Sequence, residues 1–120
     1  MSAHEKINYI EFPSKDFSET QLFFSEVFNW EFVIYGDDYM SFSNAGISGG
    51  FYRSSLVSSS ENGAALVVFY SEDLEMTLEK IRANKGKIIK PTFSFPGGRR
   101  FHFSDPTGNE FAVWSDKVLI

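Results

Sequence analysis

The chain begins its first regular segment with Tyr9-Ile-Glu-Phe-Pro-Ser-Lys-Asp16, and the pattern returns 57 residues later as Leu66-Val-Val-Phe-Tyr-Ser-Glu-Asp73. In each copy a short apolar run with strand character precedes a polar stretch that ends in aspartate. Aspartate is favoured at helix N-termini, and an apolar stripe at helical spacing follows both aspartates. The two copies therefore predict the same strand–helix unit twice.

Short strand-like runs follow each predicted helix. The first copy contains a strand at 7–12, a helix that Asp16 caps and that runs to about Phe28, and strands at 30–34, 39–43 and 47–53. The second copy contains a strand at 64–70, a helix at 74–83, and strands at 87–89, 100–104 and 110–114. After the middle loops the offset becomes 62, which places Gly50 on Ala112 and Tyr52 on Trp114. We therefore expect one domain, residues 1–120, made of two βαβββ repeats (about 5–53 and 64–118) that the Ser-rich loop 54–63 joins.

The alternation of side chains along a strand assigns residues to the two faces of each sheet. Ile10, Phe12, Val67 and Phe69 are expected under the helices. A four-stranded sheet with a helix on one face leaves its other face free, and two such faces can curl around a shared cleft. The predicted fold class is therefore α+β, with a curled mixed sheet around a cleft. The residues expected to line that cleft are Tyr9, Glu11, Gly50, Leu66, Val68, Ala112 and Trp114.

Composition excludes several functions. The formal net charge is −5, and the longest basic cluster is Arg99-Arg100, so neither nucleic acid nor an anionic membrane surface is an expected partner. The chain has no cysteine, which excludes disulfides, thiolate metal sites and a cysteine nucleophile. No apolar run has the length of a signal peptide or a transmembrane helix. We expect a cytoplasmic protein.

Three segments carry a family resemblance. They are the first strand and its cap, Tyr9 to Asp16, the helix end Phe23-Phe-Ser-Glu-Val-Phe-Asn-Trp30, and the run Pro96-Gly-Gly-Arg-Arg-Phe-His-Phe-Ser-Asp-Pro-Thr-Gly-Asn109. The layout resembles the vicinal oxygen chelate superfamily, which includes glyoxalase I, bleomycin-resistance proteins and extradiol dioxygenases. The Phe-Asn-Trp and Pro-Gly-Gly details look most like bacterial proteins described as related to lactoylglutathione lyase. The resemblance covers nearly the whole chain and implies the glyoxalase/bleomycin-resistance/dioxygenase-like fold.

The resemblance also implies where a metal would bind. Metal-using members take one ligand from the first strand of each repeat, seven residues before the capping aspartate, and one from the last strand, three residues after the Gly-Asn turn. These positions hold Tyr9, Leu66, Gly50 and Ala112 in this chain. Glycine, leucine and alanine side chains cannot bind a metal, and tyrosine is a rare ligand. We therefore expect no cofactor, and a divalent metal only if the site is displaced.

Glu11 and His102 are the candidate catalytic residues. A carboxylate and an imidazole that face one cleft could act as acid and base on a carbonyl or diol substrate. Glu11 could equally be solvated at a wide cleft mouth or paired with Arg99 or Arg100, and His102 could be a structural or surface histidine. The two arginines could hold an anionic ligand at the cleft rim, or could simply be exposed beside Asp105.

Aromatic residues suggest a binding function. A flat ligand could stack on aromatic side chains of the cleft, and the loop 54–63 could be a lid or a flexible connector. The candidate ligand-binding residues are Tyr9, Phe42, Tyr52, Leu66, Val68, Tyr70, Arg100 and Trp114. One hypothesis is a protein that binds a small molecule without metal, and the other is a lyase or dioxygenase-type enzyme with a displaced metal or the pair Glu11 and His102. Since members of the superfamily commonly associate, we also expect a homodimer.

Overall fold

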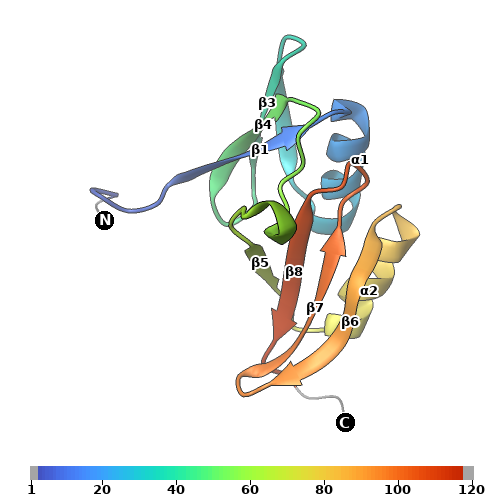
Figure 1. Ribbon diagram of the computed structural model, residues 1–120. Coiled ribbons are helices and arrows are strands. Elements are labelled where there is room, and N and C mark those ends of the chain that lie inside the picture. Colours follow the sequence, from blue (N-terminus) through green and yellow to red (C-terminus); the bar gives the residue numbers. More distant parts are fainter. Residues whose placement is uncertain (1–2, 118–120) are drawn as a thin grey trace.

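A computed structural model describes residues 3–117, which form two four-stranded sheets and two helices (Figure 1). Sheet A has the strand order β1-β4-β3-β2, and sheet B has the order β5-β8-β7-β6. The elements of the first copy are β1 (Tyr9–Ser14), α1 (Phe17–Phe28), β2 (Glu31–Tyr35), β3 (Tyr39–Ser43) and β4 (Ser48–Arg53). Those that follow are the 3₁₀ turn η1 (Ser60–Asn62), β5 (Val67–Tyr70), α2 (Leu74–Ala83), β6 (Lys87–Phe95), β7 (Gly98–Ser104) and β8 (Glu110–Ser115). Neither helix is long and apolar enough to cross a bilayer, within this described part of the chain.

Strand pairing confirms the predicted repeat. In both sheets the first strand of the copy runs parallel to the last strand, and the remaining pairs are antiparallel. Glu11 is paired with Gly50 in sheet A, and Val68 is paired with Ala112 in sheet B. These two pairs are related by the offsets of 57 and 62 residues that the sequence indicates. The α+β fold with two βαβββ units is therefore confirmed, while residue 118, the expected end of the second repeat, lies outside the described residues.

The same hydrogen bond closes the strand-to-helix turn in both copies. Ser14 Oγ lies 2.8 Å from Thr20 Oγ1, and Ser71 Oγ lies 2.7 Å from Thr77 Oγ1. In each pair the serine ends the first strand or directly follows it, and the threonine lies one turn into the helix. Each hydroxyl group thereby has a hydrogen-bond partner, so neither is left unpaired between the helix and the sheet. The repeat is thus visible in side-chain contacts as well as in topology.

The predicted helix caps are confirmed. Asp16 accepts a hydrogen bond from the backbone N–H of Glu19, and Asp73 accepts one from Met76. Asn29 ends α1 in the left-handed conformation, with φ of 61°. Asparagine tolerates this conformation better than most residues, which explains why the helix stops there and the chain enters β2.

The two sheets meet through their helix-facing sides, and aromatic rings fill the interface. Phe12 of β1 lies 5.2 Å from Phe111 of β8, measured between ring centroids. Phe28 of α1 stacks on Phe69 of β5 at 4.1 Å. Helix α1 therefore packs against sheet B as well as against its own sheet, and the two copies share one hydrophobic core. The prediction that Ile10, Phe12, Val67 and Phe69 pack on the helix-facing side is confirmed.

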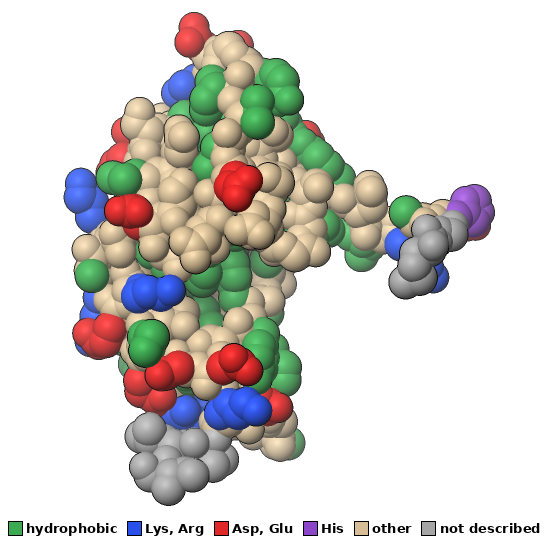
Figure 2. All heavy atoms as spheres, turned by 180° about the vertical axis from the view of Figure 1, so that it is seen from behind, with side chains coloured by type: hydrophobic (Ala, Val, Ile, Leu, Met, Phe, Trp, Pro, Cys, Tyr) green, Lys and Arg blue, Asp and Glu red, His purple; other side chains and the backbone are tan. Residues whose placement is uncertain are grey.

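Because the helix-facing sides meet, the other face of each sheet points away from the common core. Side chains alternate along β1 and β5, so Glu11 lies on the opposite face from Phe12, and Val68 on the opposite face from Phe69. The two free faces are therefore open, and Glu11 and His102 lie on different sheets. Exposed large hydrophobic residues on these faces are Tyr9, Val33, Tyr35, Tyr52, Val68 and Tyr70. Hydrophobic side chains also gather at the top of Figure 2, where the β2–β3 hairpin lies.

Strand β6 is longer than predicted. We expect a strand at 87–89 from the sequence. Pro91, two residues further on, lacks the N–H that a central strand would need. The structure continues β6 to Phe95, and the prediction was wrong for 90–95. Strand β6 lies at the edge of sheet B, where proline is tolerated, and the β6–β7 register shifts between Ile88 and Lys90 and between Lys90 and Phe93. An edge position and local bulges thus accommodate Pro91 inside a strand.

Candidate functional site

The free face of sheet A carries a hydrogen-bonded chain of two phenols and a carboxylate. Tyr39 of β3 donates its hydroxyl hydrogen to Glu11 Oε2 at 2.8 Å. The hydroxyl groups of Tyr9 and Tyr39 lie 2.6 Å apart. A phenol has one hydrogen to donate, so Tyr9 must be the donor to Tyr39. The chain therefore runs from Tyr9 through Tyr39 to Glu11, and it leaves lone pairs of Tyr9 and Glu11 available to a ligand.

Gly50 makes room for this chain. It lies in β4 between Glu11 of β1 and Ser41 of β3. A Cβ atom at Gly50 would collide with the Tyr39 hydroxyl, and it would lie 2.9 Å from the backbone oxygen of Met40. From the sequence, Gly50 is only a position where a metal ligand is missing. In the structure, the Tyr39 side chain occupies the space that a side chain at position 50 would fill.

Hydrogen bonding and burial hold Tyr39 in its protonated form. Burial of the hydroxyl raises the pKa of Tyr39 well above its ordinary value, and the hydrogen bonds to Tyr9 and Glu11 raise that pKa further. A phenol binds a metal ion as the phenolate. Tyr39 therefore acts at neutral pH as a hydrogen-bond donor and not as an anionic ligand.

A second polar cluster lies on the free face of sheet B. His102 Nδ1 lies 3.3 Å from Glu110 Oε2, and His102 Nε2 lies 3.1 Å from an Nη atom of Arg100. Guanidinium nitrogens can only donate, so Nε2 is the acceptor and Nδ1 carries the hydrogen. Glu110 therefore holds the imidazole in one tautomer, with the lone pair of Nε2 directed at Arg100.

Sequence reasoning missed Glu110 as the partner of His102. Glu110 Oε1 also accepts hydrogen bonds at 2.8 Å from the backbone N–H and from the hydroxyl of Ser60. The backbone N–H of Ser60 lowers the pKa of Glu110, against the opposing effect of partial burial, and the Ser60 hydroxyl and His102 lower it further. The alternation of side chains could have identified Glu110, because Glu110 and Trp114 lie on the same face of a predicted strand.

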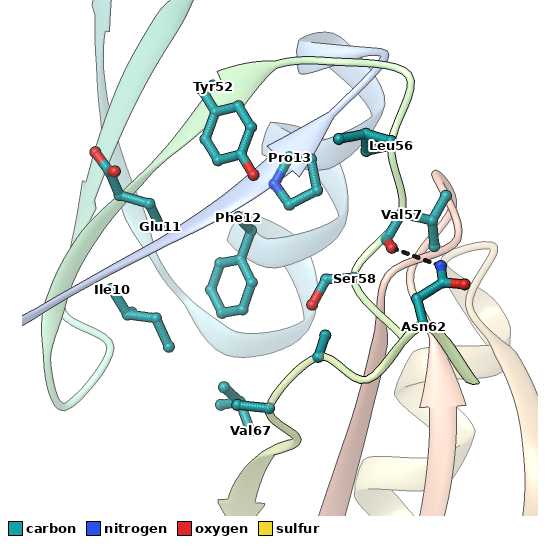
Figure 3. Close-up of a pocket in the computed structure, with 12 residues that line it drawn as sticks. Ile10, Glu11, Phe12, Pro13, Tyr52, Leu56, Val57, Ser58, Asn62 and Val67 are labelled. Carbon is teal, nitrogen blue, oxygen red and sulfur yellow. Dashed lines mark hydrogen bonds between the residues drawn. The ribbon is translucent and has the colours of Figure 1, made fainter. Parts of the chain in front are cut away.

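A cavity of about 550 Å³ lies between the two edge strands β1 and β5 (Figure 3). Pro13 and Tyr52 line one side of the cavity, and Val67 lies opposite (Figure 3). The linker supplies Leu56, Val57, Ser58 and Asn62. The volume is within the range of small-molecule sites, and the lining combines apolar side chains with a few polar groups.

The Ser-rich loop 54–63 is held by hydrogen bonds along the wall of this cavity. The Ser58 N–H donates to Asn109 Oδ1 at 2.9 Å, and the Asn109 amide donates to the Pro13 carbonyl at 2.7 Å. Asn62 donates to the Val57 carbonyl at 3.1 Å, which closes the loop on itself (Figure 3). The loop is therefore a fixed wall in this structure.

The other predicted site residues are spread over both faces. Val68 and Tyr70 line a second cavity of about 330 Å³ next to the first, and Leu66 is half-buried at the start of β5. The Tyr70 hydroxyl donates to Asp116 at 2.5 Å, which raises the pKa of Tyr70 to about 12, and the Tyr70 ring meets Trp114 edge to face. Phe42 differs from the other aromatic candidates, because it is 3% exposed and stacks on Trp30 in the core.

The two neighbouring arginines have different surroundings. Arg99 forms an ion pair with Glu75 of α2, whereas Arg100 contacts His102 on the free face. Neither arginine is hydrogen-bonded or ion-paired to Glu11, which accepts a hydrogen bond from Tyr39.

The residues at the expected metal positions do not fit a metal ion. Gly50, Leu66 and Ala112 offer no donor atom, and the Tyr9 hydroxyl is engaged with Tyr39. Within 3–117, no three histidine, aspartate or glutamate side chains are grouped so that they could hold an ion. These side chains therefore do not supply the metal ligands that the standard site of the family resemblance requires.

Comparison with known families decides the relationship. The sequence model of the Glyoxalase/Bleomycin resistance protein/Dioxygenase superfamily matches residues 6–113, which includes both repeats. The chain belongs to this superfamily. No curated protein sequence matches this superfamily member.

Solved structures of other superfamily members have the same fold. A glyoxalase-related enzyme from Fulvimarina pelagi superimposes with a TM-score of 0.75 at 16% identity, over 92% of this chain and 88% of that one. The fosfomycin resistance protein FosX from Listeria monocytogenes gives 0.76 at 21% identity, over 95% of both chains. Lactoylglutathione lyase from Agrobacterium tumefaciens gives 0.69 at 17% identity, over 92% and 93%. At these identities the likeness concerns the fold alone.

Proposed function

We propose that this superfamily member binds a small molecule that contains an aromatic ring, without the standard divalent metal site. The observation that carries the proposal is the chain Tyr9–Tyr39–Glu11, which lies over Gly50 and is open to solvent. Its carboxylate and phenol oxygens can accept hydrogen bonds, and the phenol rings can stack on a flat ligand or face a cationic group. The adjoining cavity between β1 and β5 has the volume that such a ligand requires.

We propose in addition that the protein forms a homodimer, in which a second copy covers the free faces. Tyr9 is 46% exposed, Tyr35 61% and Val33 53%, all on the free face of sheet A. A cluster of large apolar side chains on one face is typical of an interaction surface. At tens of micromolar, the chain should sediment at twice its mass of 13.7 kDa. A single species of 13.7 kDa would remove the homodimer from the proposal.

A ligand screen tests the binding function. Small aromatic compounds, neutral and cationic, are added to the full chain, and the midpoint of thermal unfolding is measured. A ligand at a hundred-fold excess over its Kd stabilises the folded state by about 2.7 kcal/mol, which a thermal shift detects. For a compound that binds, we expect amide shifts in β1 and β3 and about ten-fold weaker binding to Glu11→Gln, because a hydrogen bond to a charged group is lost.

Glu26→Gln is the matched control, because Glu26 is exposed on α1 and its replacement removes the same charge away from the free face. Binding to this variant should be unchanged. If no compound raises the midpoint at high excess, or if every ligand found is insensitive to Glu11→Gln, the proposed binding site is incorrect.

A second candidate function, acid–base catalysis, is favoured by one specific observation. Glu110 orients His102 so that Nδ1 carries the hydrogen, and Nε2 would serve as a general base when a substrate takes the place of the Arg100 N–H at its lone pair. Glu11 lies on the other sheet, so in this version Glu110 takes its place beside His102. Any turnover found for a bound compound should fall at least a hundred-fold in His102→Gln, whereas unchanged turnover would exclude His102 as the base.

A further inference from the structure

The free face of sheet B carries Lys87, Lys90 and Arg100, three cations without an acidic partner in the described chain. Neither Lys90 nor Arg100 forms an ion pair within residues 3–117. The one carboxylate in the polar cluster, Glu110, is engaged by His102 and Ser60. This concentration of positive charge contrasts with a chain whose net charge is −5.

The guanidinium of Arg100 lies near two aromatic rings and is only partly hydrogen-bonded. Its Cζ lies 5.9 Å from the ring centroid of Phe93 and 6.0 Å from that of Phe95. An Nη atom donates to His102, but Nε is shielded from water and has no hydrogen-bond partner in the described chain. The Nη hydrogens that do not contact His102 are the donors that an oxyanion on the free face would accept.

The irregular register of β6 places Lys90 beside Arg100. Phe93 is paired with Arg100, and Lys90 is paired with His102, so all four side chains lie on the free face. Residues three apart in a regular strand point to opposite faces. The register shift between Lys90 and Phe93 brings both to the same face, and Lys90 Nζ lies 4.9 Å from the centroid of the Phe93 ring. A bulge that redirects a side chain in this way is common next to functional sites.

We propose that Arg100 and Lys90 form a binding site for an oxyanion, the carboxylate or phosphate group of a small aromatic molecule. Arg100 is the main contact, because a guanidinium can offer two parallel N–H groups to one oxyanion. Lys90 adds a second positive charge near the Phe93 ring. The rings of Phe93, Phe95 and Trp114 receive the apolar part of the ligand, since Phe95 and Trp114 lie 6.2 Å apart on the same face. The inference goes beyond the proposed function, because it adds a second binding site, on sheet B, for a ligand of negative charge.

The test is a titration of the ¹⁵N-labelled full chain with phenyl phosphate and benzoate, compared with the neutral benzamide. We expect saturable shifts of the Trp114 indole resonance and of β6 and β7 amides with the two anions, and at least ten-fold weaker binding of benzamide. Arg100→Gln should weaken anion binding about ten-fold or more, and Lys90→Gln by a smaller factor. Arg100→Lys keeps the charge but loses the paired donors, so it should bind with an intermediate Kd.

Arg99→Gln is the matched control. It removes the same charge one residue away, but Arg99 is ion-paired with Glu75 of α2, so anion binding should not change. Equal anion affinity of the native chain and Arg100→Gln would overturn the proposal, and so would equal affinity for benzamide. A third outcome would also overturn the proposal: Arg100→Gln converts a dimer to a monomer, and neither the native chain nor the variant binds the anions. The guanidinium would then contact the second copy and not a ligand.

The same titrations show which of the two proposed binding sites, on sheet A or on sheet B, is occupied. Ligands that shift only β1 and β3 would leave the small-molecule function intact and remove the oxyanion site. Anions that shift β6 and β7, with no compound acting on the Glu11 face, would keep the oxyanion site and remove the proposed site on sheet A.

Discussion

Replacing Phe111 with alanine is expected to lower the free energy of unfolding by about 3–5 kcal/mol. Phe111 is fully buried in β8, and its ring lies within 6 Å of rings from both copies, at 5.2 Å from Phe12, 5.4 Å from Phe24 and 5.5 Å from Phe103. Truncation removes the transfer free energy of the ring and leaves a cavity that the neighbouring sheets cannot close. Since a small domain has a total stability of about 5–15 kcal/mol, the variant should be close to unfolding at room temperature.

Denaturation in urea, followed by fluorescence, measures this loss. Leu22→Ala is the matched control, because Leu22 is an apolar residue of α1 that is 59% exposed, and its truncation should cost less than about 1 kcal/mol. A shared core also predicts a single unfolding transition for both repeats. Two transitions, or an equal loss in Phe111→Ala and Leu22→Ala, would contradict the view that the copies are held together by this ring.

Most of the fold could be predicted because its signals are local. The helix caps at Asp16 and Asp73 and the alternation around Phe12 and Phe69 depend on neighbours in sequence, and the structure confirms them. The extent of β6 could not be predicted in this way. Whether Pro91 ends a strand depends on the position of that strand in the sheet, and only the tertiary fold places β6 at an edge.

The candidate site was less accessible from the sequence, because its contacts depend on register. Glu11 was identified by its face, but its partner Tyr39 comes from β3, and the two meet only because Gly50 lies between them without a side chain. The partnership of Lys90 with Phe93 requires a bulge that alternation does not foresee. A single sequence indicates which residues share a face, whereas contacts between non-adjacent strands follow from the pairing of the whole sheet.

Replacing Asn109 with alanine should be the second most damaging change, through hydrogen bonds instead of packing. Asn109 is 1% exposed, and its side chain joins three segments, since it donates to the Pro13 carbonyl and accepts from the Ser58 N–H. Alanine leaves both backbone groups without a partner, at about 1–3 kcal/mol each. We expect a total loss of about 2–5 kcal/mol and faster hydrogen exchange of the Ser58 amide.

The position of Asn109 makes its effect distinct from that of Phe111. Its loss should loosen the loop 54–63, which then remains tied to β8 only through Glu110. Ligand binding in the cavity between β1 and β5 should therefore weaken even at temperatures where the chain is folded. Asn62→Ala is the control, because Asn62 is exposed and its side chain makes a single hydrogen bond, within the loop. That variant should lose less than about 1 kcal/mol. If Asn109→Ala and Asn62→Ala exchanged the Ser58 amide at the same rate, the link through Asn109 would not be what holds the loop.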